Sequence, residues 1–167
     1  MQKKKRVEEL KCEALLEVQL IKMEYEQIIE KTQKEKKRNI QLISDENLKI
    51  LYTQRKDRKY AALTIELYSL VEQFLKNIYS LHDNISEYKK KGKVNTILDL
   101  QGKLDNYIEF KNITNAKILT QLRNYIIHDT FSLKQARKKF RIKKKNKELY
   151  SFLLETVEEY ISNMLVK

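Results

Sequence analysis

The chain contains no proline and only two glycines, Gly92 and Gly102. Sheets need many tight turns, and tight turns draw on glycine and proline for backbone angles that other residues disfavour. Long helices joined by few connections need neither. Hydrophobic residues make up 41% of the chain, which is enough to bury a core. The shortage of turn-forming residues therefore predicts an all-α fold.

Apolar residues at three- and four-residue steps predict one long helix over residues 5–38. Val7, Ala14 and Ile21 lie seven apart, with Leu10 and Val18 between them. Further apolar residues make the stripe wider than a two-stranded coiled-coil seam; they are Leu15, Leu16, Leu20, Met23 and Ile29. This N-terminal helix, residues 1–43, either packs against the core or a second subunit, or forms an arm that holds a partner.

The remaining apolar pattern, over residues 44–167, predicts the rest of a four- to five-helix bundle. Ser44, Asp45 and Glu46 are typical of a helix N-terminus. The helical pattern that follows reaches about residue 81, with a break near residues 55–58 as one alternative. Further helices are predicted over residues 95–110, from residue 114 or 115 to 128, and over residues 146–165. A connection is expected at residues 83–93, and a basic, partly helical segment at residues 132–147.

The charge balance is strongly basic, with 35 lysines and arginines against 23 acids and a net charge of +12. A lysine-rich composition arises either from an AT-rich genome or from a preference for polyanions. The basic residues concentrate at positions 3–6, 34–38, 89–93 and 137–147. Runs of this kind are usually solvated faces, but the last run follows the motif described below.

Several kinds of site and location are disfavoured by what the sequence lacks. Cys12 is the one cysteine, which excludes an intrachain disulfide and a cysteine-based zinc cage. No apolar run approaches the roughly 18 residues that a membrane span needs, and the basic N-terminus is not followed by a secretory apolar segment. We therefore expect a soluble cytoplasmic protein, without a cofactor, a metal or a membrane partner.

One short segment combines residue types suited to phosphodiester chemistry. On a helix, Asn124 and His128 are four residues apart and share one side, and Arg123 is long enough to reach the same space. Cleavage of RNA needs a base for the ribose 2′-hydroxyl, an acid for the leaving 5′-oxygen, and positive charge at the phosphorus. Histidine can serve as acid or base near neutral pH. Arginine stays charged and offers a planar fork of donors to phosphate oxygens.

The sequence Arg123-Asn124-x-x-x-His128 resembles the R-x(4–6)-H signature of HEPN ribonucleases, in its RN-x-x-x-H form. Requiring asparagine after arginine lowers the expected number of chance matches to about 0.006 for a chain of this composition. The resemblance covers mainly residues 58–165. It implies a helical-bundle homodimer whose composite active site cleaves RNA without a metal, in a toxin or an antiphage defence effector.

The resemblance also implies roles for individual residues. Arg123 would bind phosphate and stabilise charge, His128 would transfer protons, and Asn124 would orient the site. Supporting roles fall to Glu72, on the helix expected to face the motif, and to Tyr125 and Asp129. RNA backbone would be held by the basic run, namely Arg137, Lys138, Lys139, Arg141, Lys143, Lys144 and Lys145. Tyr125 and Phe140 are candidates for stacking on a base.

Other features limit or compete with this interpretation. In the subgroup neutralised by a nucleotidyltransferase antitoxin, a tyrosine stands two residues after the histidine, where this chain has Thr130. His82, beside Asp83, is interpreted as structural or solvent-exposed. The RNA, transfer or messenger, and any antitoxin or defence-complex partner are not identified by the sequence. Two alternatives stay open: a non-catalytic RNA- or protein-binding subunit, and a coiled-coil adaptor that uses the N-terminal stripe.

Overall fold

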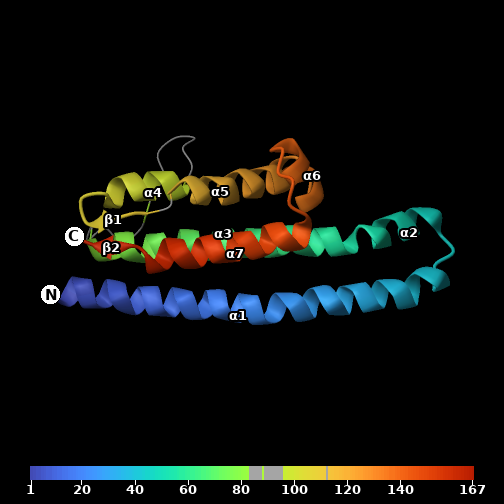
Figure 1. The fold of residues 1–167 in the computed structure, drawn as a ribbon, viewed down its shortest axis with the longest axis horizontal. Coiled ribbons are helices and arrows are strands. Elements are labelled where there is room, and N and C mark those ends of the chain that lie inside the picture. Colours follow the sequence, from blue (N-terminus) through green and yellow to red (C-terminus); the bar gives the residue numbers. More distant parts are fainter. Residues whose placement is uncertain (83–87, 89–95, 112) are drawn as a thin grey trace.

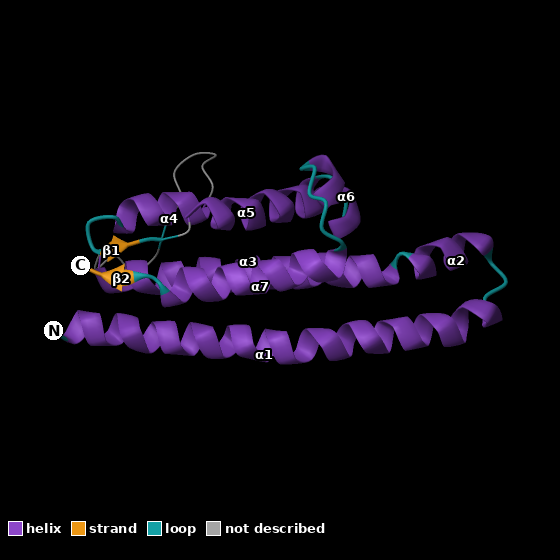
Figure 2. Cartoon of the chain, in the orientation of Figure 1, coloured by secondary structure: helices purple, strands orange, loops and turns teal. Residues whose placement is uncertain are grey.

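The computed structural model describes residues 1–82, 88, 96–111 and 113–167, and only the backbone of residues 113–115. Most of these residues are helical, which confirms the predicted all-α bundle with a long N-terminal helix (Figures 1 and 2). The helices are α1 (Gln2–Asn39), α2 (Glu46–Thr53), α3 (Arg55–His82), α4 (Thr96–Leu104), α5 (Ile113–His128), α6 (Leu133–Lys139) and α7 (Asn146–Ser162), and a 3-10 turn, η1 (Ile40–Leu42), follows α1. Two short strands, β1 (Ile108–Glu109) and β2 (Leu165–Val166), pair antiparallel.

The helices form three layers, with α3 and α7 in the middle (Figure 1). The first layer is α1, which packs on α3 and α7, and α4 and α5 cover the opposite side. The central position of α3 follows from its sequence, because Leu67, Val71, Leu75 and Ile78 are almost fully buried and lie within a helix buried on more than one side. No proline or glycine interrupts α3.

The apolar stripe of α1 is part of the core. Val7, Leu10, Val18, Ile21 and Tyr25 are each at most 6% exposed. Burying a large aliphatic side chain stabilises a fold by about 1.5–3 kcal/mol, so the stripe binds α1 firmly to the bundle. In the structure, α1 packs against the bundle along this stripe. The prediction of a wider buried stripe is wrong for Leu16, Leu20 and Met23, which are exposed because they lie on the opposite side of α1.

The end of the chain is tied to the beginning of α1. The ammonium group of Lys11 is buried and donates a hydrogen bond to the backbone oxygen of Met164 at 2.9 Å. Lys11 also pairs with Glu8 at 3.3 Å, so its charge is balanced. Both chain ends consequently lie at the same end of the bundle (Figure 1).

Several helix boundaries follow local signals in the sequence. Asp45 caps α2, accepting a hydrogen bond from the backbone N–H of Leu48 at 2.9 Å, as the sequence predicts. The break near residues 55–58 occurs at Gln54, between α2 and α3. The connection predicted at residues 83–93 lies outside the described residues except for Tyr88. The N-cap predicted at Thr114 or Asn115 is wrong, because α5 begins at Ile113 and both residues lie inside the helix.

Two helices end earlier than their apolar patterns predict. The pattern over residues 95–110 stops being helical at Leu104, where Tyr107 turns the chain by donating its N–H to the Leu104 oxygen at 2.8 Å. The last helix ends at Ser162 instead of reaching residue 165. The cause is tertiary, because Ile108 pairs with Val166 across β1 and β2, and local periodicity carries no signal for that pairing.

A carboxylate in the first turn of α3 fixes the connection that follows α5. Asp57 accepts hydrogen bonds from the Ser132 hydroxyl at 2.5 Å, the Lys134 backbone N–H at 2.8 Å and the Asn146 side-chain amide at 2.7 Å. Ser132 in turn caps α6 through the N–H of Gln135. One side chain thus joins α3, the start of α6 and the start of α7.

Asp57→Ala is expected to lower the free energy of unfolding by about 2–3 kcal/mol, because three donors lose a charged acceptor. Chemical denaturation of the purified variant measures this. Asp45→Ala is the matched control: Asp45 caps an exposed helix through one hydrogen bond and should cost about 1 kcal/mol or less. Equal losses in the two variants would show that the Asp57 network contributes nothing beyond an ordinary cap.

Candidate active site

The candidate motif occupies the second half of α5. Leu119, Leu122 and Ile126 are buried on the side of α5 that faces the bundle. Helical periodicity then leaves Arg123 half-buried at the edge of this side, and Asn124 and His128 exposed. Arg123 and His128 are five residues apart on an ideal helix, which separates them by about 7.5 Å along the axis and about 140° around it.

The guanidinium group of Arg123 is held in a fixed position. Its Cζ atom lies 4.8 Å from the centroid of the Tyr68 ring on α3, a cation–π geometry. Its Nη1 donates a hydrogen bond to the Asn124 side-chain oxygen at 3.1 Å. Its Nε is buried and has no hydrogen-bond partner among the described residues. Because this Nε is buried, an anion at the surface would have to meet the outer nitrogens of the guanidinium group instead.

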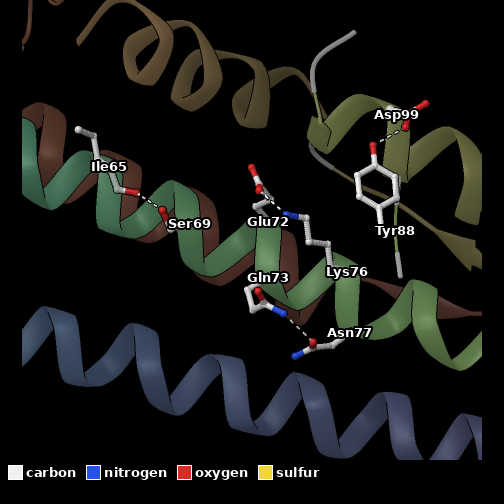
Figure 3. Close-up of polar contacts among 8 residues, drawn as sticks. All are labelled: Ile65, Ser69, Glu72, Gln73, Lys76, Asn77, Tyr88 and Asp99. Atoms are coloured by element: carbon white, nitrogen blue, oxygen red, sulfur yellow. Dashed lines mark hydrogen bonds and ion pairs between the residues drawn. The ribbon is translucent and has the colours of Figure 1, made fainter. Parts of the chain in front are cut away.

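Glu72 interacts with Tyr68, the ring on which Arg123 stacks. Burial and, secondarily, the nearby carboxylate of Glu72 raise the pKa of Tyr68 to about 12, and Arg123 opposes that rise. Glu72 pairs with Lys76 at 2.7 Å. Figure 3 shows that both side chains leave α3 on the side of Asp99, whereas Gln73, one residue along, faces α1. The structure therefore brings Glu72 and Arg123 into one polar cluster through Tyr68.

This cluster continues onto α4. Tyr88 donates a hydrogen bond to the Asp99 carboxylate, as Figure 3 shows. Lys103 pairs with Asp99 at 3.4 Å and lies 4.9 Å from the Tyr88 ring centroid. Burial of Tyr88 and its hydrogen bond to Asp99 raise the pKa of its hydroxyl. Three lysine and arginine side chains thus lie against tyrosine rings on this face, which the sequence pattern alone did not reveal.

The imidazole of His128 is exposed at the last residue of α5 and has no hydrogen bond or ion pair in the described part of the chain. Asn124 lies one turn below it on the same side. The structure brings Arg123 and Asn124 into contact, while Arg123 turns toward α3 and His128 toward solvent. In this chain the two groups therefore point to different surroundings and do not enclose a phosphate between them.

An exposed aromatic residue, Phe131, follows His128 closely, and Arg58 of α3 lies over its ring. The guanidinium carbon of Arg58 lies 5.5 Å from the ring centroid of Phe131, three residues beyond the histidine. Phe131 is 38% exposed, which is unusual for a large aromatic side chain. An exposed aromatic ring beneath a cation is suited to a base and its phosphate. The contact depends on the start of α3, so periodicity around the motif could not reveal it.

Tyr125 and Phe140 make a structural contact. Their ring centroids are 6.2 Å apart with an edge-to-face geometry, and both side chains are only partly exposed. The pair joins α5 to the end of α6. Asp129, the remaining residue with an expected supporting role, is exposed directly after α5.

The basic run occupies the last turn of α6 and the connection from α6 to α7. Arg137 serves the fold, since its Nε donates to the Asn146 side chain and its Nη1 to the Lys144 backbone oxygen, both at 3.1 Å. Lys144 lies 5.1 Å from the Phe152 ring centroid. The exposed members of the run are Lys138, Lys139, Arg141, Lys143, Lys144 and Lys145.

Arg141 has a backbone conformation that normally favours glycine, with φ of 55°. The Arg141 N–H bonds to the Lys138 oxygen at 3.1 Å, and the Ile142 N–H bonds to the Arg137 oxygen at 2.8 Å. This pair of hydrogen bonds is the Schellman motif that ends a helix, in which glycine is the common residue at the Arg141 position. An arginine there costs about 1 kcal/mol relative to glycine.

His82, the second histidine, is placed away from this surface. It is half-buried and stacks on Tyr107, with ring centroids 4.4 Å apart. Its Nε2 is buried without a hydrogen-bond partner in the described residues. Loss of solvent on burial, and secondarily the positive charge of Lys3, lower the pKa of His82. Its neighbour Asp83, in the pair noted in the sequence, lies outside the described residues.

Stability is expected to fall as the pH drops from about 7 to about 5, in part through His82. A histidine with a lowered pKa in the folded state binds its proton more readily when unfolded, so acid favours unfolding. His82→Phe keeps the stack on Tyr107 and should flatten the dependence of the free energy of unfolding on pH in this range. His128→Ala, at the exposed histidine, should keep the wild-type slope. Parallel slopes for wild type and His82→Phe would contradict the assignment.

The remaining observations concern metal ligands, membrane-spanning helices and similarity to known proteins. In residues 1–82, 88, 96–111 and 113–167, no three histidine, cysteine or acidic side chains gather as metal ligands. No described helix combines the length and apolarity that crossing a bilayer demands. Comparisons with protein-family models, curated proteins and solved structures find no match to this chain.

Proposed function

We propose that this protein is a metal-independent RNA endonuclease of the HEPN type, active as a homodimer. One observation carries the proposal: the last turns of α5 carry both the exposed His128 imidazole and a guanidinium group that Tyr68 and Asn124 hold in place. The motif resemblance at Arg123-Asn124-x-x-x-His128 supports the same chemistry, and supports a role as a toxin or antiphage effector with its own neutralising or defence partner.

In the proposed reaction, a histidine takes the proton of the ribose 2′-hydroxyl, and the 2′-oxygen forms a bond to the adjacent phosphorus. The bond from phosphorus to the 5′-oxygen breaks, and a second histidine gives a proton to that oxygen. The products are a 2′,3′-cyclic phosphate and a 5′-hydroxyl. Arg123 stabilises the charge that grows on the phosphate oxygens.

The requirement for both an acid and a base supports a dimer. One His128 serves one of the two roles at a time, and the exposed end of α5 leaves room for a second copy to supply the other. Asn124, fixed to Arg123, would orient the phosphate. Glu72 would act through Tyr68, keeping the ring in place beneath the guanidinium group.

The exposed lysines of the basic run and Arg141 are the proposed contacts to RNA backbone. The structural argument is clearest for Arg141. An arginine that occupies a position suited to glycine suggests that its side chain has a use outside the fold. Arg141→Gly should therefore raise the free energy of unfolding by up to about 1 kcal/mol and weaken RNA binding.

Denaturation and a filter-binding titration at fixed salt check both effects of Arg141→Gly. Lys31→Ala removes an exposed charge from α1, outside the basic run, and is the control for loss of charge alone. If the Arg141→Gly variant is stabilised but binds RNA with wild-type affinity, Arg141 does not contact RNA.

The exposed lysine run also suits a second candidate function, an RNA-binding subunit without catalysis. A non-catalytic subunit differs from the proposed endonuclease in one measurable respect: it binds RNA and leaves the RNA intact. Backbone contacts alone would make this binding strongly dependent on salt and nearly independent of sequence.

The test is cleavage of total RNA and of purified transfer RNA by the wild-type protein in excess EDTA. We expect fragments that carry 2′,3′-cyclic phosphate ends, which end-group analysis by mass spectrometry identifies. A 2′-O-methylated oligonucleotide is the matched control and should stay intact, because its attacking hydroxyl is blocked.

Two outcomes would contradict the proposed reaction. Cleavage that stops in EDTA would point to metal-assisted chemistry, and cleavage of the methylated oligonucleotide would exclude attack by the 2′-oxygen. RNA that is bound but intact would support the second function instead. Expression in cells gives an independent measure, since an active enzyme should slow growth and Arg123→Ala should relieve the effect.

A further inference from the structure

The outer side of α1 carries an apolar stripe that the bundle does not cover. Leu16, Leu20 and Met23 are 66%, 53% and 65% exposed. They lie at positions i, i+4 and i+7 of one helix side, opposite the buried stripe of Val18 and Ile21. Exposed apolar side chains scattered singly are ordinary, but three in helical register form a continuous surface.

This stripe borders a groove between α1 and α7. The groove encloses about 780 Å³, and its apolar walls include Leu15, Leu16 and Met23, with Cys12 at one end. On the α1 side it extends from Cys12 to Glu26, which corresponds to about 21 Å of helix. The α7 wall is shorter, with Glu158 and Ser162 alone. A bound helix of about 14 residues would therefore lie mainly along α1, held by apolar side chains at i, i+3, i+4 and i+7.

The charges around the groove are mainly negative, although the chain as a whole carries +12. Glu26 and Glu158 line the groove, and Lys22 is opposed to them. Glu24 is exposed on the outer flank of α1, and Glu155 and Glu159 are exposed on α7. In the part of the chain that the structure describes, Glu24 and Glu158 form no ion pair, so their charges are available.

We propose that this groove binds an amphipathic helix of another protein, with an apolar stripe flanked by lysine or arginine. Acidic flanks disfavour RNA, whose phosphates they repel. They also disfavour a second copy of the same face, because a two-fold contact would bring glutamates against glutamates. A basic helix buries the stripe and pairs with the glutamates at the same time.

The groove and the motif surface are on opposite layers of the bundle. Figure 1 shows α1 on one side of the layer formed by α3 and α7, and α5 on the other. A partner helix on α1 would therefore leave Arg123 and His128 uncovered. The interaction is independent of the proposed RNA cleavage, and its test does not use that activity.

The test is a fluorescence-anisotropy titration of the intact protein with a labelled synthetic peptide of about 16 residues, long enough to span the groove. The peptide carries leucines on one helix side and lysines on both flanks, and a matched peptide carries glutamates on the flanks. We expect saturable binding of the lysine peptide that weakens several-fold between 50 and 500 mM salt, with about tenfold weaker binding of the glutamate peptide.

Variants locate the binding site. The double variant Leu20→Glu/Met23→Glu should weaken binding of the lysine peptide about tenfold or more, because it places charges in the apolar stripe. Leu42→Glu, at an 80% exposed leucine in η1, is the matched control and should bind as wild type does. All three positions are exposed, and circular dichroism confirms that each variant is folded.

Three outcomes would overturn the proposal: no binding of the lysine peptide, equal binding of both peptides, or full binding by the double variant. Sedimentation velocity tests the competing occupant. If Leu20→Glu/Met23→Glu converts a wild-type dimer to a monomer, a second copy of this chain covers the groove and the proposed partner helix does not.

Discussion

Wild-type subunits mixed with an equal amount of His128→Ala subunits are expected to retain about one quarter of the RNA-cleaving activity, and not one half. The proposed site needs one imidazole from each subunit, so only dimers with two intact copies are active. Random pairing makes these dimers about a quarter of the total. The pure His128→Ala protein should lose activity by a factor of about 10²–10⁴, the usual contribution of a general acid or base. Co-expression with two different affinity tags, followed by a cleavage assay, measures both values.

The control for mixing is His82→Phe, which changes the other histidine and should leave the activity of mixed and pure dimers near the wild-type value. Retention of half the activity in the His128→Ala mixture would mean that each subunit contains a complete site. A pure His128→Ala protein with wild-type activity would exclude His128 from the reaction altogether.

The second large effect concerns α1. Ile21→Asp is expected to lower the free energy of unfolding by about 4 kcal/mol or more, because it places a charge at a position that is 6% exposed between α1 and the core. Leu20→Asp, one residue earlier and 53% exposed, should change stability by no more than about 0.5 kcal/mol. Urea denaturation followed by circular dichroism compares the two variants.

Deletion of residues 1–43 extends this comparison. The same burial predicts that the remaining chain loses its cooperative unfolding transition, since the faces of α3 and α7 that α1 covers become exposed. A shortened chain with a sharp transition, or an Ile21→Asp protein as stable as Leu20→Asp, would instead support α1 as a separable arm.

Those features that depend on periodicity alone were predictable from the sequence. The stripe through Val7, Ala14 and Ile21 indicated both a helix and the side of it that is buried, because one face of a helix recurs every three or four residues. Asp45 was predictable as a cap for a similar reason, since its hydrogen bond to Leu48 spans a fixed local distance.

Features that depend on contacts between distant segments were not predictable. The residues around Arg123 indicated a helix with an arginine at its edge, but not the Tyr68 ring that holds the guanidinium group. The sequence pattern did not single out Asp57, because its partners come from the distant segments α6 and α7. The same holds for the pairing of Ile108 with Val166, which ends α4 and α7 early.

Among the expected site residues, some features follow from local periodicity and others depend on contacts between distant segments. The spacing of Asn124 and His128 fixes their common side on α5, and both are exposed there. The proposed contact of Asn124 and His128 with Arg123 of a second subunit stays a prediction. A dimer contact leaves no periodic signal in the sequence of a single chain. The role of Arg137 also depends on tertiary structure, since its donors are used by Lys144 and Asn146.

The hydrogen bond from Lys11 to Met164 has a practical consequence for work with fusion proteins. Because it holds the two chain ends together at the end of the bundle away from α6, a tag, a fluorescent domain or a surface anchor attached to either end projects away from His128 (Figure 1). Attachment through either terminus would therefore present the candidate catalytic surface outward, and a short peptide linker could close the chain into a ring without crossing that surface.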